Sequence, residues 1–85
     1  MTRTNVTYKQ LDKTLRSLGF SCREENDDPP ARVYEHEDTG AYITIPPMPE
    51  SEFLVDYHPL AARTIVDLFG VTDPKEFDAQ VRTVG

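Results

Sequence analysis

The chain has 85 residues, of which 38% are hydrophobic and 28% are charged, the balance of an ordinary globular domain. Its 9 Lys and Arg face 15 Asp and Glu, and the formal net charge of −6 disfavours an electrostatic attraction to nucleic acid or to an anionic membrane. With no apolar run near the ~20 residues of a membrane span and no signal-peptide pattern, we expect one domain over residues 1–85, in the cytoplasm, with no membrane partner.

Metal and redox chemistry find little support in the residue types. The single cysteine, Cys22, can form neither an intrachain disulfide nor a multi-cysteine zinc site. The two histidines, His36 and His58, are far apart and form no ligand pattern. We expect no metal and no cofactor.

The first segment has the pattern of a capped helix. Thr7 and Gln10 have the spacing of a capping box, and Gly19 suits the position after a helix end. Apolar residues recur every three or four positions on one face, namely Tyr8, Leu11, Leu15 and Leu18. The pattern predicts a helix over residues 8–18.

Alternating residues then predict three strands. Residues 20–25 form the first, with Phe20 and Cys22 facing inward, and an acidic loop leads from it to Pro29-Pro30. Residues 32–36 and 41–45 form a hairpin.

A three-residue loop over residues 38–40 sets the register that we predict for this hairpin. It places His36 opposite Tyr42 and turns three residues to the core, namely Val33, Ile43 and Ile45. The opposite, free face of the sheet would carry Tyr34, His36, Tyr42 and Thr44. Glu35 falls on the core side, so either it lies at the sheet edge or the register is off by one.

Two helices follow a proline-rich connection that has weak extended character at residues 53–55. Pro59 suits the first position of a helix over residues 59–69, whose expected buried stripe is Ala61, Ile65, Leu68 and Phe69. Asp73 caps a shorter third helix that begins at Pro74, with an apolar face of Phe77, Val81 and Val84.

The element order predicts an α+β domain, because strands and helices are segregated along the chain. We expect a three-stranded antiparallel sheet with the helices packed on one face, in the order α-β-β-β-α plus a short C-terminal helix. The predicted core is Leu11, Leu15, Leu18, Phe20, Val33, Ile43, Ile45, Ile65 and Leu68.

Several short motifs resemble the HicA family of toxins. The run from Thr7 to Lys13, followed by Leu18-Gly19-Phe20, is similar to the family's opening helix, and residues 33–46 are similar to its hairpin and terminal Ile-Pro. The resemblance covers roughly residues 7 to 70. It implies a fold like that of a double-stranded-RNA-binding domain, and the activity of a small ribonuclease that cuts messenger RNA and is silenced by an antitoxin.

The chain departs from the family at the catalytic position. The family carries its catalytic histidine in a Gly-Ser-His run entering the second strand, where this chain has Pro30-Ala31. Alanine has no titratable group and cannot act as a general acid or base. The family's basic stretch after the third strand is replaced by acidic residues, namely Glu50, Glu52 and Asp56.

These observations predict a non-catalytic binding or regulatory module on a HicA-like scaffold. Its expected partner is a protein, either an antitoxin-like chain or a second copy, and no DNA partner is expected. The candidate partner-binding residues are Arg32, Tyr34, His36, Tyr42 and Thr44. The first alternative is a messenger-RNA endonuclease of a toxin-antitoxin pair that uses His36 as a displaced general base. The second is an RNA-binding domain without cleavage, which the net charge disfavours.

Overall fold

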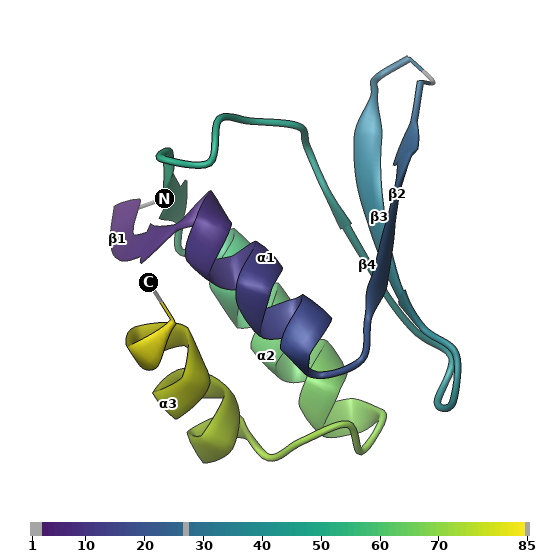
Figure 1. The fold of residues 1–85 in the computed structure, drawn as a ribbon, viewed down its shortest axis with the longest axis vertical. Helices are drawn as coiled ribbons and strands as arrows, with labels where there is room; N and C mark the ends of the chain where they lie inside the picture. The colour runs from purple at the N-terminus through teal and green to yellow at the C-terminus, as the bar shows by residue number, and fades with distance from the viewer. Residues whose placement is uncertain (1–2, 27, 85) are drawn as a thin grey trace.

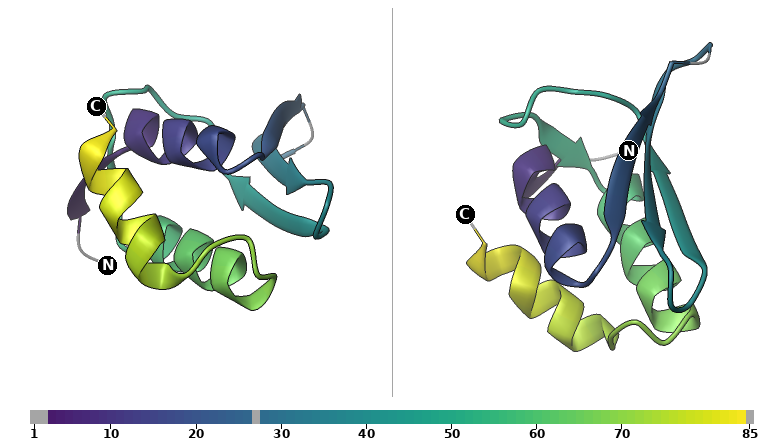
Figure 2. Two further views of the ribbon diagram at one scale, coloured as in Figure 1. Left: turned by 60° about the horizontal axis from the view of Figure 1, so that its bottom comes forward. Right: turned by 45° about the vertical axis from the view of Figure 1, so that its right-hand side comes forward.

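The structure, a computed structural model, describes residues 3–26 and 28–84, so Asp27 of the predicted acidic loop lies outside the described residues. The elements in chain order are β1 (Arg3–Thr7), α1 (Tyr8–Ser17), β2 (Ser21–Glu25), β3 (Ala31–His36), β4 (Ala41–Ile45), β5 (Phe53–Val55), α2 (Tyr57–Leu68) and α3 (Pro74–Thr83). Strands β2, β3 and β4 form an antiparallel sheet in that order. The helices lie on one side of this sheet (Figures 1 and 2). The predicted α+β class is confirmed.

A second, two-stranded sheet was not predicted. Strand β1 pairs antiparallel with β5, at the end of the molecule away from the β3–β4 turn (Figure 1). The backbone N–H groups of Tyr8 and Lys9 donate to the carbonyls of Glu52 and Glu50, at 2.8 and 3.0 Å. The proline-rich connection is thereby fixed against the start of α1.

The predicted caps of α1 and α3 are confirmed. The Thr7 hydroxyl accepts from the backbone N–H of Gln10, while the Gln10 side chain accepts from the Thr7 N–H. At α3, the Asp73 carboxylate accepts from the backbone N–H of Glu76 at 2.8 Å. Each cap satisfies a backbone donor that the first turn of a helix leaves without a partner.

The predicted register of the β3–β4 hairpin is wrong by one residue. Tyr34 pairs with Ile43 and His36 with Ala41, around a turn of four residues, 37–40. The Gly40 N–H closes this turn on the His36 carbonyl at 2.8 Å, with a φ of +77° that favours glycine. Because side chains alternate along a strand, the slip turns Tyr34 and His36 toward the helices.

The outward face of the sheet therefore carries a different set of residues from the predicted one. Glu35 pairs with Tyr42 on this face and forms an ion pair with Arg23, so the alternative of a shifted register is the correct one. Val33 is buried as predicted, but it alternates with Tyr34, and it is absent from the main hydrophobic cluster.

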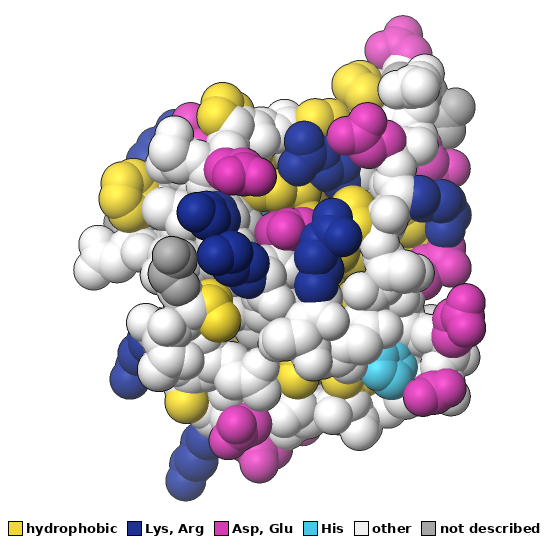
Figure 3. All heavy atoms as spheres, in the orientation of Figure 1, with side chains coloured by type: hydrophobic (Ala, Val, Ile, Leu, Met, Phe, Trp, Pro, Cys, Tyr) yellow, Lys and Arg dark blue, Asp and Glu magenta, His cyan; other side chains and the backbone are white. Residues whose placement is uncertain are grey.

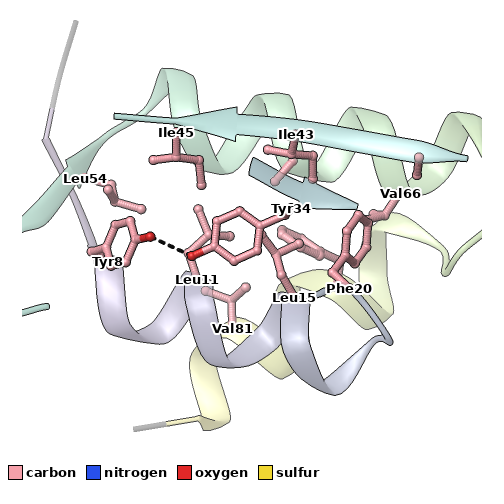
Figure 4. Packing of buried hydrophobic residues seen from close by; sticks show 13 residues of the cluster. Tyr8, Leu11, Leu15, Phe20, Tyr34, Ile43, Ile45, Leu54, Val66 and Val81 are labelled. Carbon is pink, nitrogen blue, oxygen red and sulfur yellow. Dashed lines mark hydrogen bonds between the residues drawn. The ribbon is translucent and has the colours of Figure 1, made fainter. Parts of the chain in front are cut away.

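The hydrophobic core lies between the sheet and the three helices (Figure 4). Its buried members are Tyr8, Leu11, Leu15, Phe20, Tyr34, Ala41, Ile43, Ile45, Leu54, Ala62, Val66, Phe77 and Val81. Leu18 and Ile65, predicted to be core residues, are only partly buried against it.

The predicted buried stripe of α2 is wrong at Leu68 and Phe69, whereas Ile65 packs partly buried against the core. The helix begins at Tyr57, before Pro59, and buries Ala62 and Val66. Leu68 is 73% exposed and Phe69 is 44% exposed. The face of α2 that meets the core is thus adjacent to the one chosen from the sequence.

Two leucines give a matched test of this core. Leu15→Ala should lower the free energy of unfolding by ~2–5 kcal/mol, because it leaves a cavity at a fully buried site. Leu68→Ala should change it by less than ~0.5 kcal/mol, because that side chain is largely in water. Urea unfolding followed by circular dichroism measures both, and equal losses would contradict this arrangement of α2.

Candidate functional site

The register divides the five residues predicted to bind a partner. Arg32, Tyr34 and His36 alternate along β3 on the side that faces the helices, whereas Tyr42 and Thr44 of β4 are exposed on the other side. Tyr34 is fully buried, and Tyr42 is 51% exposed. The predicted binding face therefore does not exist as one surface.

Tyr34 belongs to a chain of short hydrogen bonds between α1 and β3. Its hydroxyl donates to Asp12 Oδ1 at 2.6 Å. The Tyr8 hydroxyl lies 2.6 Å from the Tyr34 hydroxyl and is its donor, because the one Tyr34 proton is given to the carboxylate (Figure 4). On the solvent side, Asp12 accepts from Arg16 Nε at 3.0 Å. These hydrogen bonds connect α1 to β3 of the sheet.

Burial raises the pKa of the Tyr34 hydroxyl, and the hydrogen bonds with Asp12 and Tyr8 raise that pKa further. Tyr34 therefore stays protonated over the whole physiological range and acts as a structural donor. The hydrogen bond from Arg16 to Asp12 likewise raises the Arg16 pKa.

Arg32 lies over the Tyr8 end of this series of hydrogen bonds. Its guanidinium carbon lies 4.9 Å from the centroid of the Tyr8 ring, a cation–π contact. Its Nε lies 3.4 Å from Glu24 Oε1, close enough for an ion pair but without hydrogen-bond geometry. Arg32 is thus engaged with its neighbours inside the fold.

His36 has the contacts of a structural residue. Its Nδ1 lies 2.9 Å from the Thr39 hydroxyl in the turn, and its ring packs against Phe20 with centroids 5.2 Å apart. A hollow of about 480 Å³ beside it is lined partly by Glu37 and Asp38. Carboxylates at this position oppose the approach of a phosphate.

The structure offers no metal centre and no membrane span within residues 3–26 and 28–84. These residues contain no group of three or more His, Cys, Asp and Glu side chains able to hold a metal ion. No helix among them is both long and apolar enough to cross a bilayer.

The most distinctive surface was missed by the sequence analysis. On α2, Tyr57 is 59% exposed and Leu60 is 56% exposed, and together with Leu68 they are spaced by three and eight residues, which places them along one side of a helix. We define the α2–β4 surface as this stripe together with its flanking groove residues: Tyr42, Tyr57, Leu60, Ala61, Ile65 and Leu68.

Two grooves run along the α2–β4 surface. One, of about 260 Å³, lies between β4 and α2 and is lined by Tyr42, Tyr57, Ala61 and Ile65 among others. The other, of about 540 Å³, shares Tyr57, Ala61 and Ile65 and reaches Leu60. Large apolar side chains and two hollows, the 540 Å³ one mainly apolar and the 260 Å³ one of mixed polarity, therefore share one part of the molecule.

A basic strip occupies a different helix. Lys9, Lys13 and Arg16 are exposed on α1, and in Figure 3 the Lys and Arg side chains gather where α1 lies. Acidic side chains lie mostly elsewhere on this face, many along the side of the sheet (Figure 3). The net charge of −6 thus conceals a local positive region.

Comparison of the chain with protein-family models, with curated proteins and with solved structures found no match.

The role of Tyr34 can be tested by alkaline unfolding. A raised pKa in the folded state gives stability that is complete below the unfolded tyrosine pKa of about 10 and is lost as the pH rises above it. Tyr34→Phe should cost about 1–3 kcal/mol at neutral pH, because Asp12 loses a donor, and should lose less stability than the wild type between pH ~7 and ~11.

The matched control is Tyr42→Phe, in which the lost hydroxyl belongs to a half-exposed ring. It should follow the wild type at every pH. Identical pH profiles for Tyr34→Phe and the wild type would contradict a structural role for the hydroxyl chain.

Proposed function

We propose that this chain is a non-catalytic protein-binding module that binds its partner through the α2–β4 surface. The observation that carries the proposal is the apolar stripe Tyr57, Leu60 and Leu68, which lies outward on a helix whose other face already fills the core. A helix in a two-layer domain needs only one apolar face for folding. The outward apolar residues of α2 are not needed for the fold, and we propose that they contact a partner.

The size of the exposed patch supports this proposal. A half-exposed tyrosine or leucine side chain exposes on the order of 100 Å² of its surface to solvent. Tyr42, Tyr57, Leu60 and Leu68 together offer on the order of 400 Å², which is comparable to the largest patch on many monomers, and such patches are often functional. Tyrosine also combines apolar area with a hydroxyl, which suits an interface.

We propose further that the scaffold is HicA-like and resembles a double-stranded-RNA-binding domain. The motifs at residues 7–20 and 33–46 support this, as does the order of α1, the three-stranded sheet and α2, with the short β5 between the sheet and α2. On this scaffold the partner is an antitoxin-like chain or a second copy of the chain, in a cytoplasmic setting.

The non-catalytic part of the proposal rests on two positions. Ala31 stands where the family has its histidine, and His36 is held by Thr39 and Phe20 beside two carboxylates. Purified protein should leave a messenger RNA intact in the absence of metal. Cleavage that is lost in His36→Ala but retained in His58→Ala would overturn this and favour the endonuclease.

A second candidate function is RNA binding without cleavage, which the basic strip on α1 favours. If it is correct, Lys9→Gln with Lys13→Gln should abolish a gel shift with RNA, and the wild-type shift should weaken as salt rises. Leu60→Glu with Leu68→Glu lowers the net charge by the same amount, but on α2, and is the matched control. An equal loss in both double variants would contradict a specific α1 contact.

Site-directed photo-crosslinking tests the protein-binding proposal. A photoreactive phenylalanine analogue is placed at Leu60, and in the control at Phe53, which is 49% exposed on β5. In the cells that make the protein, the probe at Leu60 should give a discrete protein adduct that the probe at Phe53 does not. No adduct, or the same adducts from both positions, would contradict the α2–β4 surface as a binding site.

A further inference from the structure

We infer that the partner of the α2–β4 surface is a second copy of this chain, bound about a two-fold axis. The inference rests on the proposed protein-binding function and adds the identity of the partner. Three observations lead to it: the grooves, the open β4 edge of the sheet and the distribution of charge. The size of the patch sets the strength of the expected dimer.

The surface has the complementarity that a two-fold interface demands. In such an interface the same patch of both copies meets, so projecting side chains and the hollows that receive them must lie on one patch. Tyr57 and Leu60 project from α2; Tyr57 borders the groove of about 260 Å³ between α2 and β4, and both residues border the hollow of about 540 Å³. In the proposed dimer, the projecting side chains of each copy enter the groove of the other.

Of the two edges of the sheet, β2 and β4, the β4 edge borders this groove. Strand β4 pairs with β3 along one side, and within the described residues no strand pairs with the other side. Exposed strand edges favour association with another chain. Four consecutive β4 residues, Tyr42 to Ile45, line the groove, so a copy seated there would also cover this edge.

The charges favour a second copy over a partner of opposite charge. Among the residues that line the two grooves, Asp56 is the one acidic side chain and His58 is the one histidine, and there is no Lys, Arg or Glu. A strongly basic or acidic partner therefore meets no matching charge here. Two copies, each with a net charge of −6, can meet through this nearly neutral surface while their acidic regions stay apart.

The expected dimer is weak and reversible. About 400 Å² of projecting side chain, plus the groove walls, is smaller than the ~800 Å² per partner of a standard interface. Long-range repulsion between the two acidic copies weakens it further, and salt screens that repulsion. Added salt should therefore strengthen this association, whereas it weakens the binding of an oppositely charged partner.

Sedimentation equilibrium over ~1 μM to ~1 mM protein, a range that covers weak interfaces, tests the inference. The fitted mass should rise from the 9.7 kDa of one chain toward twice that value, and more strongly at higher salt. Leu60→Glu and Leu68→Glu should each weaken dimerisation at least ~10-fold, the effect expected at an interface anchor. Phe53→Glu adds the same charge on β5 and should leave it unchanged.

Circular dichroism establishes that each variant is folded, and Tyr57→Ser replaces any glutamate variant that is not. A wild type that stays at 9.7 kDa throughout overturns the inference, and so does a dimer that tolerates the α2 substitutions or that salt dissociates. The probe at Leu60 then separates the two proposals. An adduct of two copies supports both, and an adduct with a different protein overturns only the dimer. The absence of any adduct overturns both.

Discussion

The length of the turn between β3 and β4 determines which residues of the sheet meet the helices. Four residues, 37–40, form the turn, and its last member donates its N–H to the His36 carbonyl. The Thr39 hydroxyl accepts from the backbone N–H of Ala41 and contacts His36, which ties the turn to both strands. A slip of one residue would bury Glu35 without a partner and expose Tyr34, so the hydrophobic and polar patterns together stabilise the observed register.

The same register links the core to the surface. Tyr34 under α1 receives a hydrogen bond from Tyr8 and gives one to Asp12, so that its polar atom is satisfied despite full burial. The pairing with β3 also decides which face each β4 side chain occupies: Ile43 contributes to the core, and Tyr42 is exposed. Because α1 contacts β2 while α2 contacts β4, the apolar stripe of α2 lies near the β4 edge of the sheet and not near the β2 edge.

The features that could be predicted from the sequence are those set by residues close together in the chain. The caps at Thr7 and Asp73 involve residues three positions apart, and both were found as predicted. Strand β1 depends on pairing with β5, about fifty residues later, and its short polar sequence gave no local sign of a strand. The sequence of the hairpin is compatible with a loop of three or of four residues. The one indication against the three-residue loop was that it placed the charged Glu35 on the core side of the sheet. The apolar residues of α2, from Tyr57 to Leu68, occupy more of the circumference than one face, and helical spacing alone could not show which part is buried.

The excess of apolar residues on α2 was therefore the one sequence signal of the candidate site, and the structure gives it a position distinct from the basic strip. Helix α2 lies behind α1 in the view of Figure 1, and Lys9, Lys13 and Arg16 are exposed on α1. A dimer formed through the α2–β4 surface would leave both basic strips exposed, so the two candidate functions do not compete for the same residues. Their response to salt is opposite in sign, because an apolar contact between acidic copies gains from screening and a contact with phosphate loses from it. A single salt series on the intact chain thus distinguishes which of the two surfaces carries an association.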